Sequence, residues 1–372
     1  MILVLAQAFP PDTGGIQSVM GHLAEALGRS GEEVMVFADR VRDGGDAAAP
    51  AGAPYTVRRF TGPKPIRRRW KALAARRIMR QGSVTGIVAD SWKSLEFLPR
   101  PGVPIVALAH GMEFPSHPRS GKGSRIRRSL AAVTAVAANS SYTADLVRAV
   151  IGDAGPPITV VNPAVPSQPE PTEAARQEAA SLLADASPVL LTLARLEPRK
   201  GVDRVIEALP SLAARHPGLI YLVAGDGPDA PRLRALAAER GVAERVRFLG
   251  RVAEEVKPAL LAAADLFAMP ARREGDSVEG FGVVYLEAAW FGVPSLAGRE
   301  GGAADAVRDG ESGVLCDGAD PAAVQDAIGR LLDDSALRRR LGDAARDAVR
   351  NAGGWDAVAA RILGLLRGQP PA

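Results

Sequence analysis

Residues 189–227 read VLLTLARLEPRKGVDRVIEALPSLAARHPGLIYLVAGDG, and the fold follows outward from this stretch. Apolar and β-branched residues run without alternation over 189–194 and 220–224, as in parallel strands that are buried on both faces. Between these runs, apolar side chains recur at helical spacing over 202–215. A strand, a helix and another strand in this order predict a βαβ unit.

The same alternation extends in both directions. In the second half we expect further strands at 246–249, 266–269, 294–297 and 313–316, and helices at 230–240, 255–263, 283–291, 321–332 and 335–351. In the first half we expect strands at 2–5, 33–38, 86–89, 105–109 and 158–161, helices at 17–29, 67–80 and 142–151, and a helix end with a strand at 130–138.

A Pro-rich, polar stretch over 165–172 separates the two series and reads as a linker. The sequence therefore predicts an α/β protein with two doubly wound, Rossmann-like domains, 1–165 and 166–352, facing each other across a cleft. Ligands should bind at the carboxyl ends of the strands.

Composition excludes several classes of protein. The chain has 372 residues, of which 47% are hydrophobic and 24% charged, so it is neither disordered nor short of core-forming residues. The single cysteine, Cys316, excludes an internal disulfide framework. No apolar run approaches the ~20 residues of a membrane span, and the opening residues lack the basic region of a signal peptide. We expect a cytoplasmic protein.

Charge is unevenly distributed. Residues 1–165 carry 21 basic and 12 acidic side chains, whereas the remaining residues carry 25 and 30. No acidic residue occurs from Ala47 to Ala89, and 67–80 is rich in arginine with Trp70 and Leu73 interleaved. This pattern, with a second basic cluster at Arg125–Arg128, suits a helix lying on an anionic membrane surface. The alternative is a solvated basic face; no base-stacking platform indicates nucleic acid.

The most specific motif lies at 279–287, EGFGVVYLE, directly after an expected strand and loop. Gly280, Phe281, Gly282 and Val283 open a helix whose backbone amides can approach a phosphate. Glu279 lies at the mouth of this helix, and Glu287 lies eight residues on, where both carboxylates can accept hydrogen bonds from sugar hydroxyls. An amphipathic helix with two solvated glutamates is the alternative.

A second motif places Arg195 at the end of a buried strand and Lys200 before Gly201, so that two cations flank one turn. They could clamp a diphosphate, or be ordinary surface residues. In the first half, Gly14 and Gly15 follow the first strand and permit close approach to a ligand. The dinucleotide fingerprint G-x-G-x-x-G is absent from that turn.

His110 also follows an expected strand, where a lone histidine is more often structural. His22 and His117 have no metal-ligand spacing to any partner, so we expect no metal site. Asp226, in the turn after a further strand, reads as a helix N-cap.

Taken in order, these motifs resemble glycosyltransferase family 4, whose members have the GT-B fold. The resemblance covers nearly the whole chain and is closest to the phosphatidylinositol mannosyltransferase branch. It rests on Gly14-Gly15, His110-Gly111, Ala138–Tyr142, Val161–Pro163, Arg195 with Lys200-Gly201, Ala224–Pro228, Phe248–Val252, Glu279 with Glu287, Gly292–Pro294, Gly301-Gly302 and Trp355-Asp356. The sequence departs from the family at Asn162-Pro163, where Asn-Gly is usual, and over the longer, charged loop 272–277.

The resemblance implies a retaining transfer of a mannose- or glucose-type hexose from a GDP- or UDP-linked donor to a lipid-linked or glycan acceptor. It implies that the enzyme needs no cofactor or metal and serves cell-envelope synthesis. The basic face of the first domain would place it at the inner face of the plasma membrane. It also implies an acceptor-binding first domain, a donor-binding second domain, and a terminal helix, about 353–372, that packs back onto the first.

The family's site residues map onto this chain as follows. Arg195 and Lys200 would neutralise the diphosphate, Glu279 would hold the donor sugar, and Glu287 the ribose. Backbone groups of Gly15, Phe281 and Gly282 would contact phosphate or sugar, and His110 would lie beside the sugar. Backbone groups near Arg251 and Val252 would read the base. A sugar-nucleotide epimerase and a non-catalytic sugar-nucleotide-binding protein of the same fold remain the alternatives.

Overall fold

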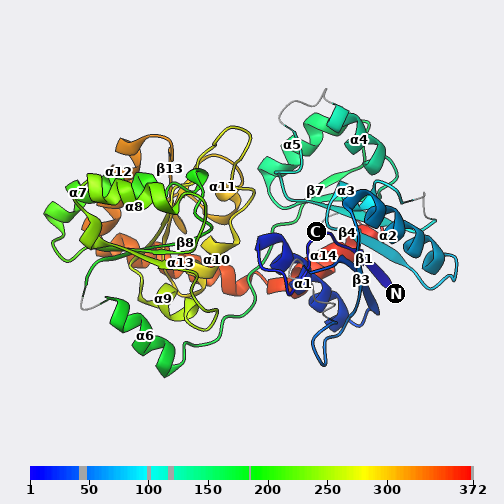
Figure 1. The fold of residues 1–372 in the computed structure, drawn as a ribbon, viewed down its shortest axis with the longest axis horizontal. Coiled ribbons are helices and arrows are strands. Elements are labelled where there is room, and N and C mark those ends of the chain that lie inside the picture. Colours follow the sequence, from blue (N-terminus) through cyan, green and yellow to red (C-terminus); the bar gives the residue numbers. More distant parts are fainter. Residues whose placement is uncertain (42–47, 99–101, 116–120, 184–185, 370–372) are drawn as a thin grey trace. The chain divides into compact units, whose positions relative to one another are not determined.

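The computed structural model describes residues 1–41, 48–98, 102–115, 121–183 and 186–369. The chain forms two compact units (Figure 1). Unit 1 consists of Met1–Pro166 and Gly353–Ala372, and unit 2 of Ser167–Ala352. Each unit contains one parallel sheet with helices packed on both faces, because its strands are apolar on both sides.

The sheet of unit 1 has the strand order β3-β2-β1-β4-β5-β6-β7. Its strands are β1 (Ile2–Leu5), β2 (Val34–Asp39), β3 (Thr56–Phe60), β4 (Gly86–Ala89), β5 (Ile105–Ala109), β6 (Ala135–Ala138) and β7 (Ile158–Val160). Its helices are α1 (Gly15–Arg29), α2 (Lys64–Met79), α3 (Trp92–Leu95), α4 (Gly121–Leu130), α5 (Ser141–Ile151) and α14 (Gly354–Leu366). The order reverses between β1 and β4, where such sheets bind ligands.

Helix α14 belongs to unit 1 although it closes the sequence. It packs beside α1 on one face of the sheet, while helices α2 to α5 cover the other face. Trp355 and Ile362 of α14 are buried in the core below α1. Arg29 pairs with Asp356 at 2.8 Å, and Arg361 donates to the Val160 carbonyl at 2.8 Å. The last helix therefore completes the core of the unit in which the chain begins.

The sheet of unit 2 has the order β10-β9-β8-β11-β12-β13. Its strands are β8 (Val189–Leu193), β9 (Ile220–Ala224), β10 (Val246–Gly250), β11 (Leu266–Met269), β12 (Ser295–Gly298) and β13 (Gly313–Cys316). Its α-helices are α6 (Glu173–Leu183), α7 (Val202–Arg215), α8 (Ala230–Glu239), α9 (Lys257–Ala263), α10 (Val283–Trp290), α11 (Ala303–Ala306), α12 (Pro321–Asp333) and α13 (Ser335–Asn351). Short 3₁₀ turns span Pro198–Lys200 and Ala243–Arg245.

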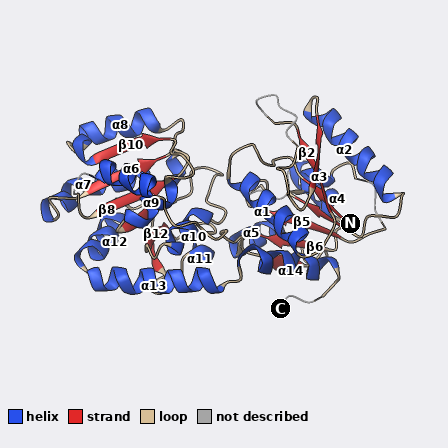
Figure 2. Cartoon of the chain, turned by 90° about the horizontal axis from the view of Figure 1, so that it is seen from below, coloured by secondary structure: helices blue, strands red, loops and turns tan. Residues whose placement is uncertain are grey.

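Figure 2 shows α13 running along the lower side of unit 2 in that view. Helices α7, α8, α12 and α13 share one core layer, and α6, α9, α10 and α11 share the layer on the other side of the sheet. The strand order of this unit reverses between β8 and β11. None of the helices in the described ranges is long and apolar enough to cross a membrane.

Besides the one-turn helices α3 and α11, two longer elements were missed in the sequence. Strand β3 lies at the sheet edge and carries Arg58 and Arg59, so its polar residues hid the pattern of a strand. Helix α6 buries only the small side chains of Ala175 and Ala179, which give little hydrophobic periodicity. The expected N-cap role of Asp226 was wrong, because α8 begins at Ala230 and the Asp226 carboxylate instead accepts the Gly227 N–H at 2.8 Å.

Candidate active site

The segments that follow β8 and β11 meet at the carboxyl edge of the sheet in unit 2, where the strand order reverses. Gly201 has a left-handed φ of 73°, and a Cβ there would lie 2.2 Å from the carbonyl oxygen of Pro270. The N–H of Arg272 donates to the Arg199 carbonyl at 2.9 Å. Backbone contact thus brings two segments about 70 residues apart together at the position where doubly wound sheets bind ligands.

Glu279 is the centre of this meeting point. Its Oε2 accepts hydrogen bonds from Lys200 Nζ at 2.5 Å and from Arg199 Nη1 at 2.9 Å. All three side chains are less than 15% exposed, at 12%, 11% and 13%. Burial alone would raise the pKa of the Glu279 carboxyl, but Lys200 and Arg199 outweigh it and hold that pKa below its ordinary value. Glu279 is therefore an ionised acceptor at neutral pH.

Arg199 is the residue of this cluster that sequence reasoning missed. It lies in the 3₁₀ turn next to Lys200, and Glu197 fixes it from the other side, with 3.0 Å between Arg199 Nε and Glu197 Oε2. Glu197 also pairs with Arg195 at 3.3 Å, but the Arg195 side chain is 70% exposed. The structure therefore brings Lys200 together with Glu279 and leaves Arg195 at the rim of the cluster.

Gly280 to Val283 lead from Glu279 into α10. Gly282 is the residue before the helix, with a left-handed φ of 90° that favours glycine and no side-chain cap on the first amides. Tyr285 anchors the helix by donating its hydroxyl hydrogen to the Met269 carbonyl at 2.7 Å. The backbone N–H groups at the start of α10, which no side chain caps, therefore follow Glu279 closely in the sequence. The Tyr285–Met269 hydrogen bond attaches this end of the helix to the end of β11.

Glu287 and the residues after β10 complete the predicted set in unit 2. Glu287 lies on α10, and burial raises the pKa of its carboxyl despite the nearby Lys257. Arg251 is exposed and Val252 is half-buried directly after Gly250, whose carbonyl accepts the Gly225 N–H at 2.7 Å. Among the described residues, no hydrogen bond or ion pair joins Glu287, Arg251 or Val252 to the Glu279 cluster.

Arg272, the first residue of the charged loop 272–277, is buried, whereas residues 273–276 are exposed. Its guanidinium is buried and forms two hydrogen bonds to the Asp203 carboxylate, at 2.8 and 2.9 Å. Asp203 lies in the first turn of α7, directly after the turn that holds Lys200. This ion pair, together with the hydrogen bond from the Arg272 backbone N–H to the Arg199 carbonyl, fixes the turn that carries Arg199 and Lys200.

In unit 1, the predicted site residues lie at the carboxyl ends of β1 and β5. Gly14 precedes α1 with a φ of 146°, and the position of a Cβ on Gly15 is open. His110 follows β5, and its backbone N–H donates to Glu113 Oε1 at 2.7 Å. The ring Nε2 of His110 is buried without a partner among the described residues. His117 lies outside the described residues.

The basic helix α2 is divided between two environments, a division that the sequence pattern did not predict. Lys71 is buried and pairs with Asp39 at 2.6 Å, and Arg67 pairs with the same carboxylate at 2.6 Å. Arg68 pairs with Glu96 at 3.0 Å. The outer face carries three exposed apolar and four exposed basic side chains: Ile66, Trp70 and Leu73 with Arg69, Arg76, Arg77 and Arg80.

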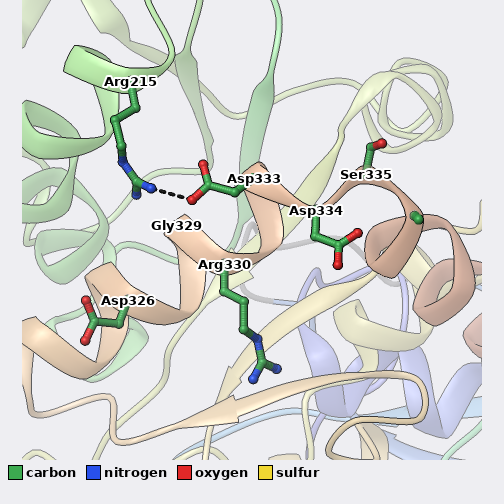
Figure 3. A pocket seen from close by; sticks show the side chains of 8 residues that line it. Arg215, Asp326, Gly329, Arg330, Asp333, Asp334 and Ser335 are labelled. Carbon is green, nitrogen blue, oxygen red and sulfur yellow. Dashed lines mark hydrogen bonds and ion pairs between the residues drawn. The ribbon is translucent and has the colours of Figure 1, made fainter.

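A shallow groove on unit 2 lies beside α12, away from the Glu279 cluster (Figure 3). Of its three aspartates, Asp333 pairs with both Arg215 and His216, and Asp334 accepts the backbone N–H of Leu337 at 2.8 Å. Because two arginines line the groove together with three aspartates, it carries charges of both signs and offers a ligand no concentrated charge of one sign. In the parts of the chain that the structure describes, no group of three or more His, Cys, Asp or Glu side chains is arranged to hold a metal ion.

Comparison with protein families gives two matches. Residues 13–168 match the model "Glycosyltransferase Family 4", and residues 174–348 match "Glycosyl transferases group 1". A "GDP-mannose-dependent alpha-(1-6)-phosphatidylinositol monomannoside mannosyltransferase" of Mycobacterium tuberculosis is 33% identical over 100% of this chain and 99% of its own length. The Corynebacterium glutamicum enzyme named for the monoacylated acceptor is 30% identical over 99% and 98%.

Solved structures resemble the whole chain as well. Sucrose-phosphate synthase from Thermosynechococcus elongatus superposes with a TM-score of 0.80 at 22% identity, covering 98% of both chains. Anabaena HepE in complex with UDP gives a TM-score of 0.77 at 21% identity, covering 98% of this chain and 99% of its own. These likenesses confirm the expected GT-B fold, with two Rossmann-like domains.

Proposed function

The chain belongs to the glycosyltransferase family of these relatives and is a hexosyltransferase; from this premise we propose that it transfers mannose from GDP-mannose to a phosphatidylinositol mannoside or a closely related phosphoglycolipid. The donor and the acceptor rest on the names of relatives that align over their whole length. The epimerase and the non-catalytic binding protein gain no support from these relatives.

The observation that carries the proposal is the pairing of Lys200 and Arg199 with Glu279 at the carboxyl edge of β8 and β11. When the bond between sugar and diphosphate breaks, negative charge develops on the leaving phosphate. Two fixed cations beside the open amides of α10 stabilise that charge without reorganising. Arg195, at the exposed rim, would close on the diphosphate once it is bound.

The remaining site residues have proposed roles that follow from the resemblance of the chain to its family. Ionised Glu279 accepts hydrogen bonds from the donor sugar, and Glu287 accepts them from the ribose. Backbone groups of Gly280, Phe281, Gly282 and Val283 contact phosphate, while Arg251 and Val252 lie against the base. In unit 1, Gly14 and Gly15 approach the donor closely, and His110 lies beside the sugar.

We propose that the reaction retains the configuration of the sugar and needs no divalent metal. Lys200 and Arg199 supply the positive charge that a metal supplies in other enzymes. Attack by the acceptor hydroxyl on the same face as the departing diphosphate, whose phosphate oxygen takes the hydroxyl proton, gives retention without a flanking pair of carboxylates.

The exposed face of α2 supports a lipid-bound acceptor. Its apolar side chains Ile66, Trp70 and Leu73 are 46%, 56% and 65% exposed, and they lie at helical spacing between arginines. Such a face binds anionic membranes by partial insertion and charge attraction, with each basic residue contributing about 1 kcal/mol. Arg125 to Arg128 on α4 are further candidates, although Arg125 also pairs with Glu96 at 2.6 Å. We propose peripheral binding to the cytoplasmic leaflet.

A product assay tests the function. Vesicles containing phosphatidylinositol mannoside are incubated with GDP-mannose or UDP-glucose in excess EDTA, and the lipid products are identified by mass spectrometry. We expect one added hexose from GDP-mannose only, with an α-linkage by NMR. Transfer from UDP-glucose alone, transfer only to soluble glycans, or strict dependence on Mn²⁺ would each contradict the corresponding part of the proposal.

A further inference from the structure

A line of alternating charges runs through the turn that follows β8. Its ion pairs join basic and acidic side chains in the order Arg195, Glu197, Arg199, Glu279 and Lys200. The two ends of this line differ in their surroundings, because the Lys200 side chain is buried and the Arg195 side chain is exposed. The line therefore connects the buried Glu279 cluster to a cation that solvent reaches.

Glu197 is the carboxylate that holds this outer cation. Its Oε1 lies 3.3 Å from Arg195 Nε, and its Oε2 accepts a hydrogen bond from Arg199 Nε at 3.0 Å. Leu196, between Arg195 and Glu197, is buried, and its backbone N–H donates to the Asp226 carbonyl at 3.0 Å. The backbone that carries both charges is thus fixed, while the guanidinium of Arg195 lies in solvent and can change its partner.

The two ion pairs of Glu197 differ in strength. The pair with Arg199 is shielded from water, and Glu279 holds the same guanidinium at 2.9 Å. The pair with Arg195 is exposed on the arginine side, and exposed ion pairs contribute little because water screens them. A phosphate group can accept two parallel hydrogen bonds from one guanidinium. A diphosphate beside the Glu279 cluster would therefore displace Glu197 from Arg195 and leave Arg199 in place.

We propose that Glu197 competes with the diphosphate of the nucleotide for Arg195. Without nucleotide, Glu197 holds Arg195, and on binding the guanidinium exchanges this carboxylate for the diphosphate. The exchange lowers the affinity for the diphosphate, because the Arg195–Glu197 pair has to break. After sugar transfer, the same competition favours release of the nucleoside diphosphate. Glu197 is thus a positioning residue that acts through Arg195, and this role rests on the proposed function.

Calorimetric titration of the whole protein with GDP, and in parallel with UDP, tests the competition. Glu197→Gln keeps the shape of the side chain and removes its charge. We expect this variant to bind the nucleotide about three- to fivefold more tightly than the wild type, the range set by one exposed ion pair. The matched control is Glu207→Gln, since Glu207 is 19% exposed and also pairs with two arginines, Arg204 and Arg240. The control should leave the affinity unchanged.

The Arg195→Met background separates competition from a purely structural role. There, Glu197→Gln should no longer strengthen nucleotide binding, because the cation that both anions contact is gone. Weaker binding by Glu197→Gln in both backgrounds would show that Glu197 only supports Arg199, and it would overturn the proposal. Equal gains in both backgrounds would overturn it as well. Glu197→Ser removes the whole carboxylate and should reproduce the results of Glu197→Gln.

The choice of nucleotides separates this inference from the proposed function. Binding of UDP and not GDP by the wild type would contradict the proposed donor, and the competition is then measured with UDP. Binding of GDP with equal affinity by the wild type and Glu197→Gln would contradict the competition alone. Binding of neither nucleotide by the wild type would overturn both.

Discussion

Two segments rich in basic residues use their charges in opposite ways. In the turn at 195–200, Lys200 and Arg199 converge on the one buried carboxylate of Glu279. Helix α2 instead divides its cations, with Lys71 and two neighbours paired inside and the rest exposed beside Trp70 and Leu73. The comparison shows that a count of basic residues does not locate a binding site, whereas the partner of each cation does.

The largest effect should come from breaking the converging cluster. Glu279→Gln keeps the shape of the side chain and removes the charge that holds Lys200 and Arg199. We expect kcat/KM to fall by about 10²–10³, as for loss of one preorganised group that acts in the transition state. The matched control is Glu311→Gln, a glutamate that is 72% exposed on the same unit. Equal activity of both variants would remove Glu279 from the site.

On α2, the inner face should matter for stability. Lys71→Met leaves Asp39 with Arg67 as its remaining ion-pair partner, and loss of one partner of a buried pair costs about 3 kcal/mol at the lower end of the usual range. Urea unfolding followed by circular dichroism measures this cost. Arg77→Met, on the exposed face of the same helix, should change the unfolding free energy by no more than about 0.5 kcal/mol. Similar values for the two variants would contradict the division of the helix.

The outer face of α2 should matter for membranes. Replacing Trp70 and Leu73 by serine removes apolar surface without disturbing the core, and we expect binding to anionic vesicles to weaken by about tenfold. Co-sedimentation with anionic and zwitterionic vesicles, at low and high salt, provides the measurement. Wild-type binding to neither kind of vesicle at low salt would refute the membrane-binding role of this face.

The smallest expected effect is on the pH dependence of stability. The pKa values of the Glu287 and Glu279 carboxyls are shifted in opposite directions. The folded pKa of Glu287 is raised above its ordinary value of 4.5, so the native state binds more protons and stability falls as pH rises through the window between these values. The folded pKa of Glu279 is lowered, so its contribution is present above the ordinary value and is lost as pH falls through the folded pKa.

Glu287→Gln should therefore raise Tm slightly at pH 7, and this gain should shrink as the pH is lowered below 4.5. Glu279→Gln should lower Tm at pH 7. Thermal unfolding followed across this pH range compares the two. A gain in Tm for Glu279→Gln at pH 7, or a loss for Glu287→Gln, would reverse the assignment of the two carboxyls.

Much of the fold was predictable because buried parallel strands and amphipathic helices leave strong apolar patterns, as at β8, α7 and β9. Edge strand β3 and helix α6 were missed because arginines and alanines weaken those patterns. In the site, the sequence placed Lys200 and Glu279 each at a strand end. It did not pair them, because the contact spans 79 residues and depends on how the backbones of Gly201 and Pro270 meet.

Arg199 and the inner cations of α2 were not identified from the sequence for a related reason. Whether a basic side chain is buried against a carboxylate depends on acids that are distant in sequence, such as Glu279 for Arg199 and Asp39 for Lys71. The local pattern of charges reveals neither the distance between a basic side chain and its carboxylate partner nor the burial of the pair.

The central claim is that Lys200 and Arg199, held by Glu279, bind the diphosphate of the donor without a metal. Calorimetric titration of GDP into the wild type and Lys200→Met, in excess EDTA, tests it most directly. The account predicts that the wild type binds GDP in EDTA and that Lys200→Met binds it at least about tenfold more weakly, as for the loss of one charged hydrogen bond. Equal affinities, or binding by the wild type only after Mg²⁺ or Mn²⁺ is added, would contradict the claim.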